Sequence, residues 1–169
     1  MDHLFQPLQA IIWDLKSEVM SGYFDHYSAK GNHLLSELAA ELGEPDNIPR
    51  AARVLRCTLH TLRRCLSIEE SLHFISQLPL IIKGVYVDGW KVSHKERIKT
   101  WDEFLLDLFD ADGAPAGSDF EDRESAAIAV AAVLRVLMAH VSAGEMSDII
   151  AQLPAQLKSA LLALMTNDF

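Results

Sequence analysis

Six basic residues between positions 50 and 64 are spaced so that their side chains could bind an anion together. They are Arg50, Arg53, Arg56, His60, Arg63 and Arg64. At about 100° per residue they fall on one side of a helix, with apolar residues on the other. No Asp or Glu lies between Asp46 and Glu69 to neutralise this basic stripe, and guanidinium groups suit phosphates and carboxylates. The stripe is either a docking face for an acidic partner or ligand, or a solvated face paired with the protein's own carboxylates, which we favour.

Cys57 falls among these arginines, and neighbouring positive charge can lower the pKa of a thiol toward a reactive thiolate. A thiol-based enzyme is therefore one hypothesis. No Cys-x-x-Cys motif accompanies Cys57, and Cys65 lies too far along the same helix to form a disulfide with it. We favour a cysteine packed at the edge of the core. The arginines near Cys57 and His60 oppose a bound cation, so no metal site is predicted there.

Tyr86, Asp88 and Trp90 place aromatic and acidic groups around one turn, which could form a recognition surface for a partner. The alternative, which we favour, is that Trp90 plugs the junction between two structural units after a tight Asp-Gly turn.

The run Asp110-Ala111-Asp112-Gly113 resembles part of a calcium loop, but the register fails. With Gly113 as the sixth position, Leu108 would be the first ligand and Asp119 the twelfth. We interpret the acidic residues from 110 to 124 as a solvated loop followed by negative charge at a helix N-terminus. The sequence has no His-Glu-x-x-His spacing, no Gly-x-Ser-x-Gly elbow and no glycine-rich phosphate loop. We expect no catalytic residue, cofactor or metal, and we lean against an enzyme.

The elements that would position these groups are all predicted to be helices, and no strand is evident. Apolar periodicity, capping boxes (Ser67 with Glu70, Thr100 with Glu103, Ser142 with Glu145) and proline breaks predict helices at 7–21, 32–42, 49–66, 67–78, 80–86, 100–109, 121–140, 142–153 and 155–165. Gly22 is predicted to end the first helix, and 23–30 is ambiguous. Residues 110–118 are predicted to be loop.

The second half of the chain repeats the first at an offset of 75 residues. Gln77-Leu78-Pro79 recurs as Gln152-Leu153-Pro154, and the caps and apolar positions agree in phase. We predict one domain, 1–169, that forms an all-α helical bundle. It is built from two similar multi-helix units at 32–90 and 100–165, with an N-terminal extension at 1–31.

The two long helices of this repeat differ in polarity. The helix at 121–140 carries Ile128, Ala131, Met138 and Ala139 where its counterpart carries arginines, so we predict that it is the central helix and is buried all round. Its extra apolar face requires a cover. The N-terminal helix is one candidate, and a second subunit is the other.

Composition excludes several classes of function. Half the residues are apolar and the net charge is −9, which argues against general binding to nucleic acid or to an anionic membrane. The N-terminus has no export signal, and no stretch approaches the roughly 18 apolar residues of a spanning helix. We therefore expect a cytoplasmic location.

The run from Gln77 to Trp90, with its weaker echo at 152–154, resembles the bacterial family known as domain of unknown function 2267. The resemblance covers about 32–165, including the Leu59-x-x-Leu62-Arg63 pattern. It implies an all-helical fold and supplies no catalytic residue, cofactor or substrate.

We expect a non-enzymatic helical module that binds an unidentified protein through the basic stripe and the Tyr86–Trp90 turn. The alternative is a small anionic ligand bound at the stripe, and the third hypothesis is the thiol-based enzyme. A homo-oligomer is also compatible with the sequence.

Overall fold

The computed structural model describes residues 5–91, 97–113, 115–141 and 143–166, with side chains from residue 22 onward except at 143, 145 and 146. These ranges contain nine helices and no strand, which confirms the predicted all-α fold. Within the same ranges, no helix combines the length and the apolar character that crossing a membrane requires.

Most helix boundaries lie where local capping signals predicted them. The helices are α1 (Phe5–Glu41), α2 (Ile48–Leu62), α3 (Ile68–Gln77), α4 (Leu80–Val87), α5 (Trp101–Asp112), α6 (Ala116–Asp119), α7 (Arg123–His140), α8 (Ala143–Gln152) and α9 (Ala155–Thr166). Capping boxes at Ser67 and Thr100 start α3 and α5. Pro79 and Pro154 separate the two short helix pairs, because proline cannot continue the preceding helix.

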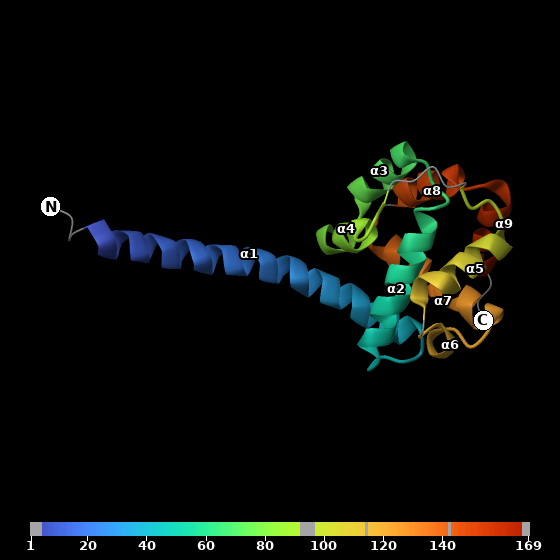
Figure 1. Cartoon of the computed structure of the whole chain (residues 1–169), viewed down its shortest axis with the longest axis horizontal. Helices are drawn as coiled ribbons and strands as arrows, with labels where there is room; N and C mark the ends of the chain where they lie inside the picture. The colour runs from blue at the N-terminus through green and yellow to red at the C-terminus, as the bar shows by residue number, and fades with distance from the viewer. Residues whose placement is uncertain (1–4, 92–96, 114, 142, 167–169) are drawn as a thin grey trace.

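The first helix differs from the prediction. α1 is one continuous helix of 37 residues, so the expected break at Gly22 was wrong. A glycine inside a helix costs only about 1 kcal/mol relative to alanine, which is too little to end a helix by itself. Figure 1 shows α1 leading outward from the body that the other helices form. The side chains of residues 7–21 lie outside the described part of the structure. The predictions that they form an apolar face and cover the helix at 121–140 therefore stay predictions.

The C-terminal part of α1 belongs to the body. Gly31, Leu34, Leu38 and Ala39 are buried, and α1 contacts α2, α4 and α7. Two polar contacts also tie α1 to α7, from Glu37 to His140 and from Glu41 to Arg135. This part of α1 is therefore packed against three helices.

α7 is a central helix, as predicted, along most of its length. Its buried side chains are Ala126, Ala127, Ala129, Val130, Ala131, Ala132, Val133, Leu134, Val136 and Leu137. The prediction of burial all round was wrong at two places. Met138 and Ala139 in the last turn are exposed, and Ile128 near the start of α7 is only half-buried. α7 contacts α1, α2, α5 and α9, and these neighbours leave its C-terminal end partly uncovered.

The acidic segment before α7 is more ordered than a loop. α5 continues to Asp112 and ends at Gly113, whose φ of 70° suits a glycine. Ala116–Asp119 forms the single helical turn α6, so the prediction of loop over 110–118 was wrong for most of these residues. Asp122 and Ser125 form a capping box, and α7 begins at Arg123, two residues later than the predicted start at residue 121. The capping box predicted at Ser142 lies outside the described residues.

The helix starts follow the offset of the predicted repeat. α2 and α7, α3 and α8, and α4 and α9 each begin 75 residues apart. α2 contacts α7, and α3 contacts α8. These boundaries are consistent with two similar units, and the two-unit architecture itself stays a prediction.

Candidate functional site

The basic stripe runs along α2 and continues through Arg63 and Arg64, which follow the last residue of this helix, and most of its side chains are directed onto neighbouring helices. Arg50 donates from Nη2 to the backbone oxygen of Asp119 at 2.8 Å and from Nη1 to Glu44 Oε1 at 3.1 Å. Arg53 forms a bidentate salt bridge with Asp119, in which Nε donates to Oδ2 at 2.6 Å and Nη2 donates to Oδ1 at 2.7 Å. Arg64 pairs with Asp107. The stripe therefore pairs with the protein's own acceptors, the arrangement favoured from the sequence, although Arg56 remains exposed.

The far end of the stripe covers the C-terminus of α4. His60 Nε2 lies 2.8 Å from the backbone oxygen of Val85, and Arg63 Nη1 donates to the backbone oxygens of Tyr86 and Asp88. The last carbonyls of a helix lack partners within the helix, and positive charge is favourable there. Burial lowers the pKa of His60, so the ring is neutral, and its Nε2–H donates to the backbone oxygen of Val85. These two side chains therefore cap α4.

Cys57 is fully buried beneath the stripe. Its Sγ lies 2.8 Å from the backbone oxygen of Arg53 and 3.3 Å from Asp112 Oδ1. Burial, and after it the Asp112 carboxylate, together raise the pKa of the thiol to about 12, which outweighs the opposite effect of Arg56. The sequence suggested a lowered pKa from the nearby arginines, but burial dominates. The thiol is protonated at neutral pH, and the structure gives a nucleophilic role no support.

Asp112 and Asp119 form a buried acidic pair, not the solvated loop that the sequence suggested. Their exposed fractions are 5% and 1%. Burial raises the pKa of Asp112, and the charge of Asp119 raises it further. Asp112 Oδ2 is buried and has no hydrogen-bond partner among the described residues. Across the described residues, no three His, Cys, Asp or Glu side chains are placed to hold a metal ion.

The aromatic turn after α4 is mostly internal. Tyr86 has an exposed fraction of 0%, and its hydroxyl donates to Ser71 Oγ at 2.9 Å. Its ring meets Trp90 edge-on, and the Arg63 guanidinium lies 5.9 Å from the centre of the half-buried Trp90 ring. Burial removes Tyr86 from the predicted interaction surface, while Asp88 is exposed. These contacts of Trp90 lie within α2 and the α4 end, so they do not bear on a plug between two units.

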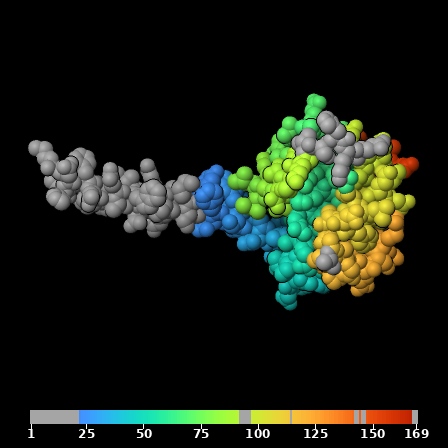
Figure 2. Space-filling model, viewed as in Figure 1, coloured from blue at the N-terminus to red at the C-terminus, as the bar shows by residue number. Residues whose placement is uncertain are grey.

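Large apolar side chains are exposed on α3 (Ile68, Leu72), α5 (Leu106), α7 (Met138) and α9 (Leu162), and five more are exposed on α1 and α4, a surface that the sequence did not single out. The five are Tyr23 (53% exposed) and Phe24 (57%) on α1, and Leu80 (47%), Ile81 (39%) and Val87 (43%) on α4. We call these five residues the α1–α4 edge. α4 packs closely against α1 here, because a Cβ at Gly31 would lie only 3.0 Å from Ile81 Cγ2. Figure 2 shows α4, in light green, against the blue part of α1.

A signal for this surface exists in the sequence of α4. Apart from Lys83 and Gly84, every residue of α4 is apolar, and the helix has only eight residues. A helix on the surface of a body buries one face, here through Ile82 and Tyr86, so the remaining apolar residues face outward. Counting the apolar residues of this helix against a single buried face predicts exposure.

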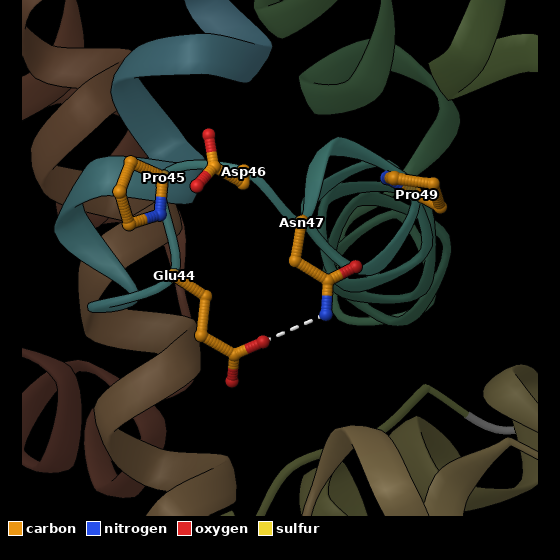
Figure 3. A pocket seen from close by; sticks show the side chains of 5 residues that line it. All are labelled: Glu44, Pro45, Asp46, Asn47 and Pro49. Atoms are coloured by element: carbon orange, nitrogen blue, oxygen red, sulfur yellow. Dashed lines mark hydrogen bonds between the residues drawn. The ribbon is translucent and has the colours of Figure 1, made fainter.

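A small open hollow lies in the turn between α1 and α2. It is lined by Glu44, Pro45, Asp46, Asn47 and Pro49 (Figure 3). Two of its polar side chains already have partners within the chain, because Asn47 Nδ2 donates to Glu44 Oε2 at 2.7 Å and Asn47 Oδ1 accepts from the backbone nitrogen of Arg50. The turn therefore serves to cap α2 and presents no free set of donors to a ligand.

Comparison with known proteins places the chain beside a family without a described activity. A family model with the description "Uncharacterized conserved protein (DUF2267)" matches residues 31–160. The match begins at Gly31, where α1 meets α4, and leaves the outward part of α1 outside it. No curated protein matches the chain.

Proposed function

The chain belongs to the DUF2267 family of uncharacterized conserved proteins, and we propose that it is a non-enzymatic helical module that binds another protein through the α1–α4 edge. The observation that carries this proposal is the exposure of five large apolar side chains on α1 and α4, two helices that pack against each other. Tyr and Phe side chains are enriched at protein interfaces, and the fully buried centre of an interface is more apolar than the rest of the protein surface. Full burial of an exposed Leu, Val or Phe side chain contributes about 1.5–3 kcal/mol, and these half-exposed side chains would each contribute a part of that to a contact.

The basic stripe is less suited to docking than the sequence indicated. Arg50, Arg53 and Arg63 donate to Glu44, to Asp119 and to the end of α4, so a partner would have to compete with contacts that hold the fold. The alternative of a small anionic ligand requires arginines that converge on a cavity. The guanidinium groups instead point to separate acceptors on different helices, and no observation favours that alternative.

A comparison of matched surface variants tests the proposal. Leu80→Glu/Val87→Glu changes the edge on α4, while Leu106→Glu/Leu162→Glu changes exposed leucines on α5 and α9 as a control. Partners captured from a lysate by the wild type should be retained by the control and lost by the edge variant, with all three proteins shown to be folded by circular dichroism. An Arg56→Glu variant examines the exposed part of the basic stripe. Loss of the partner in Arg56→Glu alone, or equal capture by all the variants, would refute the edge as the contact surface.

A further inference from the structure

We infer that Asp112 and Asp119 share one proton, and that this proton is a pH-sensitive latch that holds α6 against α2 and α5. The inference does not depend on the proposed function, because it concerns the buried acidic pair and not the α1–α4 edge. It follows from the burial of both carboxyl groups, from an oxygen of Asp112 that has no partner, and from the way in which Arg53 is already engaged.

The charges around the pair do not balance if both carboxyl groups are ionised. Arg53 forms its bidentate salt bridge with Asp119. Arg50 donates to the backbone oxygen of Asp119 and pairs with the carboxylate of Glu44. Asp112 forms no ion pair within the described part of the chain, although its exposed fraction is only 5%. A carboxylate buried without a counter-charge is costly, and binding a proton removes that cost.

A proton on Asp112 also provides the missing hydrogen bond. Oδ1 of Asp112 accepts from the thiol of Cys57 at 3.3 Å, whereas Oδ2 is buried and has no partner among the described residues. An ionised carboxylate can only accept hydrogen bonds, but a protonated carboxyl group has an O–H donor. Asp119 lies within hydrogen-bonding reach of Asp112, and its carboxylate is a strong acceptor for such a donor. The shared proton therefore leaves the pair with a single negative charge, which Arg53 balances.

The neighbours of Asp112 set the direction of the pH response. The groups that most affect its pKa are Arg53 and Cys57 on α2 and Asp119 on α6, and none of these lies on α7 or α9, which also contact α5. Burial and the Asp119 charge raise the pKa of Asp112, and they outweigh the opposite effects of Cys57 and Arg53. The latch is therefore complete below about pH 4 and is lost as the pH rises through the raised pKa.

α6 is the element that should respond when the proton leaves. It has only four residues, no side chain caps its first turn, and it contacts α2 and α5 (Figure 1). Asp119 is its last residue, and the ring of the next residue, Phe120, packs edge-on against Phe109. Two like charges repel each other in a buried site, and a single helical turn has few hydrogen bonds to oppose that repulsion. Loss of the proton should therefore loosen α6 and Phe120 before it affects the longer helices.

Nuclear magnetic resonance of the full chain between about pH 4 and pH 8 tests both parts of the inference. The side-chain carboxyl carbons of Asp112 and Asp119 report the proton. In the wild type, both carboxyl signals should shift in one common step, at a pH above the ordinary aspartate pKa of 3.8. Independent behaviour of the two signals would show that each group titrates alone.

Hydrogen exchange of backbone amides reports the closure of α6. The Phe120 amide donates to the backbone oxygen of Ala116 across α6. Its protection factor, which is corrected for the intrinsic pH dependence of exchange, should fall at least about tenfold as the pH rises through the common step, the effect of one pKa unit. The Lys83 amide, which donates to Pro79 at the start of α4, should keep its protection factor over the same range.

Two variants separate the acidic pair from other titrating groups. Asp112→Asn has an N–H donor for Asp119 at every pH, so the protection factor of the Phe120 amide should no longer depend on pH. Asp110→Asn removes an exposed carboxylate from the last turn of the same helix and should behave as the wild type does.

Three results would overturn the inference. An Asp119 carboxyl signal that stays constant while Asp112 titrates would exclude a shared proton. A Phe120 protection factor that does not change through the step would exclude the latch. A pH response that persists in Asp112→Asn would assign the response to other groups. The first two results come from the wild type, so they decide the question even if Asp112→Asn does not fold.

Discussion

Replacing Asp112 by asparagine should raise the free energy of unfolding at neutral pH, although it removes a charged group from a hydrogen-bonded site. Asp112 is 5% exposed, its Oδ1 lies 3.3 Å from the Cys57 thiol, and its Oδ2 is buried without a partner among the described residues. Burial and the Asp119 charge raise the pKa of Asp112 above its ordinary value of 3.8. Folding at neutral pH must therefore bury this charge or bind a proton.

The sign of the effect follows from the raised pKa. A group with a higher pKa in the folded state binds protons more readily there, so its contribution to stability is complete below about pH 4 and is lost as the pH rises through the folded pKa. Asparagine has the same shape and does not titrate, and its amide can donate to the Asp119 carboxylate, the neighbour whose hydrogen bonding and charge raise the pKa of Asp112. A buried polar atom without a partner costs about 1–3 kcal/mol. We expect Asp112→Asn to gain about 1–2 kcal/mol at neutral pH and nearly nothing at acid pH.

Urea unfolding followed by far-ultraviolet circular dichroism across the acid to neutral range measures this difference. Asp110→Asn is the matched control, because Asp110 is an exposed carboxylate in the last turn of the same helix. Its effect should stay within about 0.5 kcal/mol at every pH. If Asp112→Asn destabilises the protein at neutral pH, or if its effect does not vary with pH, the account of a strained buried carboxyl is refuted.

Three further predictions follow from burial and packing. Both cysteines, whose pKa values burial raises to about 12, should resist Ellman's reagent at neutral pH in the folded protein and react fully in guanidinium chloride; rapid reaction of the folded protein would contradict their burial. Gly84→Ala should raise the free energy of unfolding by about 0.5–1 kcal/mol. Gly31→Ala should raise it less, because the new Cβ at residue 31 would lie 3.0 Å from Ile81 Cγ2. Equal gains of the two variants in urea unfolding would argue against this contact. Burial lowers the pKa of His60, so the contribution of His60 to stability should be present above about pH 6.5 and lost as the pH falls through the folded pKa. The free energies of unfolding of the wild type and His60→Gln should therefore diverge between neutral and mildly acid pH. Parallel plots of the two free energies against pH would contradict the lowered pKa.

Local signals in the sequence predicted the helix boundaries of this fold well. A capping box or a proline acts within a few residues, so Ser67, Pro79 and Thr100 mark boundaries that depend little on the rest of the chain. Gly22 misled the prediction, because the propensity cost of one glycine is small compared with the benefit of continuing a helix into a packed body.

The candidate site was less predictable, because its properties depend on residues far apart in the sequence. Periodicity correctly put the basic stripe on one side of a helix, but the acceptor of Arg53 is Asp119, 66 residues away. The pKa of Cys57 depends on how α5 packs over α2, which no local pattern records. Tyr86 was assigned to a surface because of its type, whereas Ser71 supplies the partner that allows it to be buried.

The unbroken course of α1 also fixes the helical phase of the whole N-terminal segment relative to the body. One residue inserted between 22 and 30 would rotate every side chain before it by about 100° and advance it by about 1.5 Å. Seven inserted residues would nearly restore the original direction, to within about 20°, at a greater distance from the body. The direction of this segment relative to the body therefore depends on the number of residues in α1, and changes by whole heptads preserve it more closely than changes by single residues.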